Sequence, residues 1–321
     1  MYSFQDLVKL FAERFQKKHF PPQPSTLYDA ADYFLQLDGK RVRPVLCLMA
    51  NELFDAIHPA AWDAASAIEL FHNFTLIHDD IMDKAPLRRG APTVHVQHGE
   101  STAILSGDVM LIQAYEYLNK IPQQHLHLVL QLFNTTAKQV CEGQQIDMDF
   151  EKCNNVALKE YVEMITLKTS VLLACSLQIG AILGGANENN QQHVYEFGKN
   201  VGIAFQIQDD YLDAFGDPEK FGKQIGGDIV ANKKTFLWIH ALEVATPAQH
   251  KTLQQLTVEN PADKVAQVLS IFKDCNVDVW AKALKQQYFD IALQHLEAVD
   301  VLDERKQHLK ALAEYLIQRE V

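Results

Sequence analysis

The sequence Asp79-Asp80-Ile81-Met82-Asp83 recurs 130 residues later as Asp209-Asp210-Tyr211-Leu212-Asp213, and each copy ends a long apolar stretch with helical periodicity. On a helix, the first and last aspartates of a copy lie one turn apart on the same face, with the middle aspartate beside them. Such close carboxylates repel one another, and acidic groups late in a helix face the negative end of its dipole. A single copy fits an acidic surface face, whereas two copies indicate a hard cation that compensates this cost. Oxygen ligands without His or Cys favour Mg²⁺, which is typically shared with substrate phosphates.

The rest of the chain has helical periodicity and no convincing series of strands, which predicts an all-α protein. A stiff break at Pro21-Pro22-Gln23-Pro24 and a stop signal at Gly184-Gly185 separate helices. Long helices are predicted over about 25–36, 42–55, 60–83, 102–119, 123–150, 157–183 and 190–214, with shorter helices to Arg319. Several exceed about 20 residues without a heptad seam, which predicts a single large helical bundle around a central cavity. We expect residues 1–321 to form one domain.

The composition excludes some partners and compartments. Hydrophobic residues make up 48% and charged residues 22% of the chain, which is ordinary for a globular protein with a sizeable core. The formal net charge of −12 argues against a nucleic-acid partner, so phosphate binding must come from local basic clusters and metal ions. The five cysteines have no paired spacing and are expected to be free thiols in a reducing compartment.

Two apolar segments bear on membranes. Residues 1–20 lack the apolar core of a signal peptide and form an amphipathic stripe that we expect to pack on the protein body or a partner subunit. The most apolar run, Val171–Leu183, is expected to be too short to cross a bilayer and to form a buried core helix. We therefore expect a cytoplasmic protein without stable membrane insertion.

Basic segments near the acidic motifs indicate what the metal ions would hold. Arg binds phosphate through parallel hydrogen bonds, Lys supplies a compact point charge, and helix N-termini add backbone donors. The segments are Gly39-Lys40-Arg41-Val42-Arg43-Pro44, Arg88-Arg89-Gly90, Lys168-Thr169, Gly222-Lys223, Gly226-Gly227-Asp228 and Lys233-Lys234-Thr235. Each alone fits solvated surface charge, although Lys168 lies among apolar neighbours.

In their order and spacing, these motifs resemble those of the trans-isoprenyl diphosphate synthases, also called polyprenyl synthetases, from about Gly39 to Thr235. The resemblance also includes His72, Gly143-Gln144-x-x-Asp147 and the segment Phe205-Gln206-Ile207-Gln208 before the second acidic motif. It implies an all-α bundle of the isoprenoid synthase type with a deep central cavity, usually as a homodimer. It further implies Mg²⁺-dependent, head-to-tail condensation of isopentenyl diphosphate with an allylic diphosphate (dimethylallyl, geranyl or farnesyl) and release of pyrophosphate.

The resemblance implies a role for each site residue. Three Mg²⁺ ions bridged by the allylic diphosphate would be coordinated by Asp79, Asp83 and Asp209, supported by Asp80, Asp210 and Asp213. The allylic diphosphate itself would be bound by Arg88, Lys168, Lys223 and Lys233. The diphosphate of isopentenyl diphosphate would be bound by Lys40, Arg43, His72 and Arg89. Thr169 and Gln206 would face the allylic cation, and pyrophosphate would accept the final proton.

An aromatic stripe before the first acidic motif bears on product length. By the same resemblance, Phe71 and Phe74 would form the floor of the cavity for the growing prenyl tail. Along a helix they lie roughly 12 Å and roughly 7 Å from Asp79, although an ideal helical wheel offsets the stripe from the carboxylates. Two phenyl rings predict a short product, C15 or C20. The motif lacks the two-residue insertion of typical bacterial farnesyl diphosphate synthases, which favours the geranylgeranyl type.

Three alternatives explain less of the sequence. A class I terpene cyclase shares the first motif but needs no second diphosphate site. A His–Asp phosphohydrolase would use His78-Asp79 and leave the second motif unexplained. A non-catalytic subunit of a heteromeric prenyl synthase usually loses part of an acidic motif, and both are intact here. His78, His95 and His98 are equally consistent with structural roles.

Overall fold

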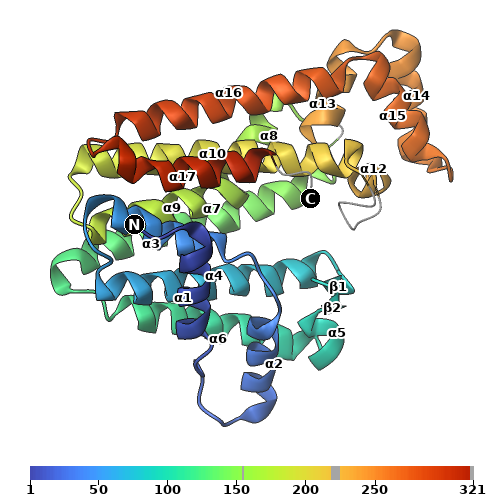
Figure 1. Cartoon of the computed structure of the whole chain (residues 1–321). Coiled ribbons are helices and arrows are strands. Elements are labelled where there is room, and N and C mark those ends of the chain that lie inside the picture. The colour runs from blue at the N-terminus through green and yellow to red at the C-terminus, as the bar shows by residue number, and fades with distance from the viewer. Residues whose placement is uncertain (154, 218–224, 319–321) are drawn as a thin grey trace. The chain divides into compact units, whose positions relative to one another are not determined.

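A computed structural model describes residues 1–153, 155–217 and 225–318 of the chain (Figure 1). In chain order the elements are α1 (Phe4–Phe15), α2 (Ser25–Gln36), α3 (Val42–Phe54), α4 (Pro59–Met82), β1 (Leu87–Arg88), β2 (Ala91–Pro92), α5 (Val94–His98), α6 (Glu100–Leu118), α7 (Gln123–Phe150), α8 (Leu158–Ile165), the π-helical segment η1 (Thr166–Ser170), α9 (Val171–Leu183), α10 (Glu188–Phe215), α12 (Gly227–Val230), α13 (Phe236–Val244), α14 (Pro247–Glu259), α15 (Lys264–Asp274), α16 (Val277–Ala298) and α17 (Asp303–Gln318).

The predicted all-α class is confirmed, and the long predicted helices end within about two residues of the observed ones, the usual uncertainty of helix ends. Two local features were not predicted. The loop after the first acidic motif contains the short β1–β2 hairpin, and the helix around Lys168 contains the π-helical segment η1. Both are too short to change the periodicity of a longer window.

The chain divides into two compact units. Unit 1 comprises Met1–Phe133, Ser176–Gln192 and Val301–Leu309. Unit 2 comprises Asn134–Cys175, His193–Asp300 and Lys310–Val321. The single domain over residues 1–321 stays a prediction.

Helix α4 is central to unit 1, where α3 and α6 pack against it. It begins at Pro59, since His58 Nδ1 accepts a hydrogen bond from the N–H of Ala60 at 3.1 Å. Small buried residues such as Ala61, Ala64 and Ala65 let its neighbours approach closely. The packing fixes the C-terminal end of α4, which carries the first acidic motif.

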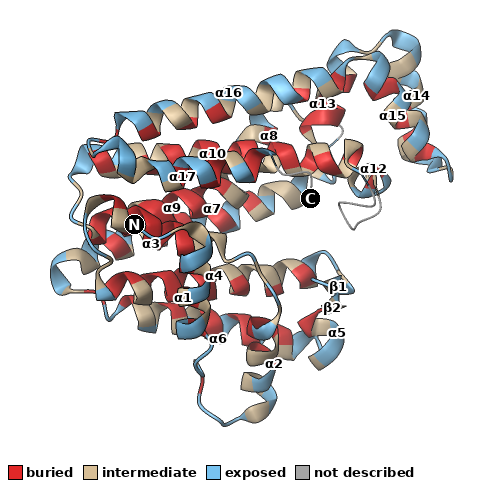
Figure 2. Ribbon diagram, viewed as in Figure 1, coloured by how far each residue is buried: buried red, intermediate tan, exposed pale blue. Residues whose placement is uncertain are grey.

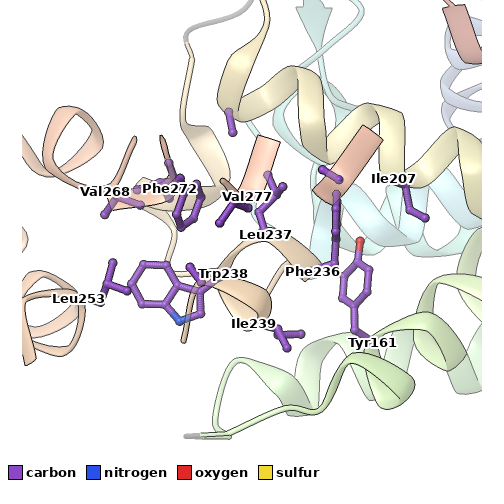
Figure 3. Packing of buried hydrophobic residues seen from close by; sticks show 14 of the residues in the cluster. Tyr161, Ile207, Phe236, Leu237, Trp238, Ile239, Leu253, Val268, Phe272 and Val277 are labelled. Atoms are coloured by element: carbon purple, nitrogen blue, oxygen red, sulfur yellow. The ribbon is translucent and has the colours of Figure 1, made fainter. Parts of the chain in front are cut away.

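An aromatic and aliphatic cluster forms the core of unit 2 (Figure 3). The ring of Phe236 on α13 lies between Tyr161 on α8, at 5.9 Å between centroids, and Trp280 on α16, at 5.7 Å. Trp238 and Phe272 extend the cluster toward α15. This packing holds α8 in place and thereby positions the hydroxyl group of Tyr161, whose partner lies on α10.

The prediction about the most apolar run was wrong in one respect. Val171–Leu183 continues a helix that begins at Leu158, and the combined 26 residues are long and apolar enough to cross a membrane. However, 72% of its most apolar window is buried inside the protein, and α9 is buried along almost its whole length (Figure 2). That burial is typical of a core helix of a soluble protein.

Candidate active site

The first acidic motif lies at the C-terminal end of α4. Asp79 and Asp80 occupy the last turn, and Asp83 caps the helix with its N–H donating to the carbonyl of Asp79 at 2.9 Å. Asp80 is only 1% exposed, and burial raises the pKa of its carboxyl group, while the charge of Arg88 opposes this effect. The Oδ2 atom of Asp80 is buried and accepts no hydrogen bond from the described residues, so it has an unused carboxylate oxygen suited to a cation.

A hairpin turn brings Arg88 onto this motif. Strands β1 and β2 pair antiparallel, and the two turn residues, Arg89 and Gly90, have positive φ angles of 53° and 79°. Arg88 Nε and Nη2 each lie 2.7 Å from Asp80 Oδ1, and Nη2 lies 3.5 Å from Asp79 Oδ2. The guanidinium group therefore compensates the two carboxylates that crowd the end of α4.

Arg43 and His72 form a buried pair in the same unit. Arg43 Nη1 lies 3.1 Å from His72 Nε2, and because an arginine only donates, Nε2 accepts and the imidazole is neutral. Burial holds the pKa of His72 well below its ordinary value, and Arg43 and Arg89 lower it further. Burial also lowers the pKa of Arg43 to about 10, and its Nε atom is buried without an acceptor among the described residues. A buried guanidinium N–H without an acceptor suits an anion.

Further basic residues surround this pair. Arg41, which the sequence did not single out, forms an ion pair with buried Glu69 and donates to Leu35 O at 3.1 Å. Arg89 donates from Nη1 to Leu37 O at 3.2 Å, and Lys40 is exposed. We call Arg41, Arg43, His72, Arg88 and Arg89 the arginine–histidine cluster. Electrostatic interaction of all four arginines with His72 shows that positive charge is concentrated here.

In unit 2, the π-helical segment η1 presents Lys168 and Thr169. A single extra residue per turn widens the helix, and such bulges occur frequently at functional sites. Gly143 on α7 packs directly on this bulge, because a Cβ atom there would lie 2.3 Å from the backbone nitrogen of Lys168. One turn later on α7, Asp147 accepts a hydrogen bond from Lys168 Nζ at 2.6 Å. The sequence motif Gly143-Gln144-x-x-Asp147 thus combines close backbone approach with a partner for the lysine.

A chain of hydrogen bonds leads from the bulge to the second acidic motif on α10. Thr169 Oγ1 donates to Gln206 Oε1 at 3.3 Å, and Gln206 Nε2 donates to Asp210 Oδ1 at 2.9 Å. The hydroxyl group of Tyr161 donates to the other oxygen of Asp210. Burial and the charge of Asp228 raise the pKa of Asp210 to about 7. Tyr161 was not predicted, although a tyrosine two helical turns before Lys168 in an apolar helix was a usable signal.

Asp213, one turn after partly buried Asp209, contacts the segment that follows the motif. Its carbonyl accepts from the N–H of Gly226 at 2.7 Å, and its Oδ2 accepts from the N–H of Asp228 at 3.0 Å. Asp228 Oδ1 lies 3.2 Å from Lys233 Nζ. Burial alone would lower the pKa of Lys233, but the charges of Asp228 and neighbouring aspartates outweigh it and raise the pKa. Lys223 lies outside the described residues.

The aromatic stripe on α4 is divided between core and partly buried positions. Phe71 is 1% exposed and packs against Phe133, at 5.1 Å between centroids, and Phe74, at 5.6 Å. Phe74 is partly buried and also contacts the His78 ring edge-on, at 4.7 Å between centroids. His78 Nε2 donates to Ile104 O at 3.1 Å, which ties α4 to α6 as a structural contact.

In the described part of the chain, no group of three or more His, Cys, Asp or Glu side chains is arranged to hold a metal ion by itself. Each acidic motif instead offers carboxylate oxygens beside basic residues within its own unit. This donor set fits Mg²⁺, which often completes its coordination with water and substrate phosphates.

Comparison with known proteins identifies close relatives. A sequence model of the polyprenyl synthetase family matches residues 24–274. The chain is 34% identical to the short chain isoprenyl diphosphate synthase of Methanothermobacter thermautotrophicus, with 100% of both chains covered. It is 37% identical to the geranylgeranyl diphosphate synthase of Saccharolobus solfataricus, covering 97% of this chain and 95% of that protein. A crystal structure of a geranylgeranyl pyrophosphate synthase is 41% identical, with a TM-score of 0.95 over 100% of both chains.

Proposed function

The chain belongs to the polyprenyl synthetase family, and we propose that its two acidic motifs, the arginine–histidine cluster and the lysines near the second motif carry out the reaction. The family resemblance of the sequence is confirmed. The protein is a short-chain prenyltransferase that joins isopentenyl diphosphate head-to-tail to an allylic diphosphate and releases pyrophosphate. Its relatives support neither a non-catalytic subunit nor a terpene cyclase.

The observation that supports our division of roles most directly is the Arg43–His72 pair. A reaction with two diphosphate substrates needs two anion sites, and in this pair the buried Nε–H of Arg43 has no acceptor among the described residues. We assign Arg43, His72, Arg89 and Lys40 to the diphosphate of isopentenyl diphosphate. A neutral His72 can donate a hydrogen bond from Nδ1 to a phosphate oxygen while Nε2 accepts one from Arg43. The charge of Arg41 is compensated by Glu69, so we assign Arg41 a structural role in the cluster.

Mg²⁺ dependence is general for this family. We propose that Asp79, Asp83 and Asp209 are ligands of three ions and that Asp80 and Asp213 support them. When bound, Mg²⁺ stabilises the negative charge that develops on the departing pyrophosphate. The buried Oδ2 of Asp80 fits this assignment. Asp210 fits a supporting role best, because both of its oxygens accept hydrogen bonds from protein donors.

The allylic diphosphate is assigned to Arg88, Lys168, Lys223 and Lys233. Arg88, Lys168 and Lys233 each form an ion pair with an aspartate. Their charged groups are therefore already oriented before negative charge develops on the leaving group. Thr169 and Gln206 are assigned to the face of the allylic cation. The amide of Gln206 is fixed by Asp210, so the oxygens of Gln206 and Thr169 supply oriented dipoles that stabilise positive charge without attacking it.

We propose geranylgeranyl diphosphate, C20, as the main product. Two relatives carry that product in their names, and C20 lies within the range that the sequence predicts. Phe74 is the better candidate for the limiting wall, because Phe71 is already enclosed by Phe133 and Phe74.

We also propose that the protein is a cytoplasmic homodimer with one domain per chain. The exposed face of α6 supports the dimer, since Ile104, Leu105 and Ile112 are 41%, 53% and 60% exposed on one side of a helix whose other side is buried. Exposed apolar patches of this kind mark interaction surfaces.

The decisive experiment incubates the purified chain with isopentenyl diphosphate and, in turn, dimethylallyl, geranyl or farnesyl diphosphate. We expect geranylgeranyl diphosphate by mass spectrometry, and loss of turnover when Mg²⁺ is chelated. Arg43→Met should raise the KM for isopentenyl diphosphate by about 10-fold or more, as expected for loss of a charge-assisted contact. The control Arg14→Met removes an exposed arginine that stacks on Trp62 in the same unit and should leave this KM unchanged. An unchanged KM in Arg43→Met would contradict the assigned site.

A further inference from the structure

Lys264, the first residue of α15, is a buried lysine outside the residues assigned above. We infer that it is a positioning residue that holds Lys233 in place for the allylic diphosphate, and this inference rests on the role proposed for Lys233. The side chain of Lys264 is 1% exposed. Its Nζ atom donates to Asn232 Oδ1 at 2.6 Å, Asn260 Oδ1 at 3.2 Å and Val230 O at 3.4 Å. All three donor positions of the ammonium group are therefore used.

The charge of Lys264 is costly to bury, because its three acceptors are neutral oxygens. Burial lowers its pKa, and the neighbouring charge of Lys234 lowers it further. An apolar side chain of similar length would avoid this cost, so stability of the fold alone does not account for the lysine. What the ammonium group supplies is orientation, since it joins two segments of the chain, Val230–Asn232 and the residue Asn260 at the end of α14.

The more constrained of these two segments is the turn that precedes Lys233. Asn232 has a left-handed backbone with φ of 57°, and both ends of its side-chain amide are held, by Lys264 and by Thr257 O at 3.4 Å. The next residue, Lys233, donates its backbone N–H to Asp228 O at 2.9 Å and places Nζ 3.2 Å from Asp228 Oδ1. The direction in which Lys233 leaves the backbone therefore depends on the Asn232 turn, and the turn depends on Lys264.

The first turn of α15 also holds the other end of α12 (Figure 1). Val265 packs so closely on Gly226, whose φ is 80°, that a Cβ atom there would lie 2.6 Å from Val265 Cγ1. Gly226 in turn donates to the carbonyl of Asp213. Lys264 and Val265 thus hold both ends of α12, the short helix that contacts Asp213 through Gly226 and is followed by the turn before Lys233.

The test compares five variants by steady-state kinetics, inhibition by inorganic pyrophosphate and thermal unfolding: Lys264→Met, Asn232→Ala, their double variant, Val268→Ala and Lys233→Ala. Lys264→Met keeps the length of the side chain and removes the ammonium group. We expect kcat to fall at least about 10-fold, because small misplacement of a catalytic contact has large effects on rate. Inhibition by pyrophosphate with Mg²⁺ should weaken in parallel, while the KM for isopentenyl diphosphate stays within about twofold, since its proposed site lies in unit 1.

Asn232→Ala should reproduce this pattern without removing a buried charge, which keeps the test valid if Lys264→Met fails to fold. The double variant should lose no more activity than the worse single variant, because both substitutions break one interaction. Val268→Ala is the matched control: Val268 is fully buried on the same helix, so the variant should lower the unfolding temperature and leave kcat unchanged.

Three results would overturn the inference. In the first, Lys233→Ala lowers kcat and pyrophosphate inhibition, but well-folded Lys264→Met and Asn232→Ala do not; the role of Lys233 then stands and the positioning role of Lys264 falls. In the second, Lys264→Met and Val268→Ala lose kcat in proportion to their loss of stability, which assigns Lys264 to structure alone. If Lys233→Ala itself leaves both readouts unchanged, the role proposed for Lys233 is wrong, and the inference falls with it.

Discussion

Substitution of Phe71 and Phe74 on α4 by alanine distinguishes a residue that stabilises the core from a residue that limits product length. Phe71 is almost completely buried and touches two other aromatic rings, whereas Phe74 is partly buried. Phe71→Ala in a closed core costs about 3–5 kcal/mol, of which each aromatic pair contributes about 0.5–1.5 kcal/mol. For a cooperative chain of 321 residues, this loss lowers the unfolding temperature by about 4–7 °C. Phe74→Ala removes less buried area and should cost about 1–2 kcal/mol.

The effects on product length should follow the opposite order. Phe74→Ala opens the wall that we assign to the prenyl tail, so the principal product should lengthen by one or more C5 units with the condensation reaction intact. Phe71→Ala alone should change product length little, because the ring of Phe74 still covers the space. The double variant should give the longest products, since the tail can then occupy the space of both rings.

Liquid chromatography of the products, combined with thermal unfolding, measures both quantities in the same variants. A long allylic diphosphate that fills the new space should stabilise the double variant more than the wild type, as expected for a ligand that binds only the folded state. Phe11→Ala is the control, because Phe11 is also 1% exposed in unit 1 but lies on α1; it should lose stability without a change in product. An unchanged length distribution in the double variant would refute the assignment of this wall.

Three further predictions concern the metal site, pH and the dimer. Asp79→Asn and Asp209→Asn should each lower turnover by about 10²–10³-fold with the fold retained, measured by initial rates and circular dichroism, and near-normal Mg²⁺-dependent rates would exclude the metal role. A folded-state pKa of about 7 for Asp210, against an ordinary 3.8, means that metal-free stability is lost as pH rises between these values, by at most about 4 kcal/mol. With Mg²⁺ chelated, Asp210→Asn should therefore make the free energy of unfolding in urea nearly constant between pH 4 and pH 7 and higher than in the wild type at pH 8. The same substitution should lower turnover. A pH dependence of stability like that of the wild type would show that Asp210 is ionised without cost. Ile112→Lys should shift the protein from dimer to monomer in analytical ultracentrifugation, unless the dimer uses another surface.

The sequence predicts most of the helices because the signals are local. Apolar residues that recur every three to four positions define α4 and α10 without reference to the rest of the chain. The two acidic motifs were equally readable, because i and i+4 residues share a helical face wherever the helix lies. The family-specific basic residues were found by order and spacing, which the comparisons with relatives confirm at the level of the family.

Local patterns did not reveal which side chains meet. Tyr161 lies 49 residues from Asp210 and Arg41 lies 28 residues from Glu69, yet each pair shares a hydrogen bond, buried in the first pair and partly buried in the second. The π-helical bulge at Lys168 was missed for a related reason. It does not change the local hydrophobic periodicity, and the feature that goes with it is the close approach of Gly143 on α7, a contact between distant residues.

The sequence by itself therefore determined the helices, the acidic motifs and the reaction class. Only the tertiary structure decided that Arg88 lies on Asp80, that His72 is neutral beside Arg43, and that Lys264 holds the Asn232 turn. The physical reason is that helical periodicity arises from contacts within one or two turns, whereas desolvation and charge pairing depend on which distant segments the packed core brings together.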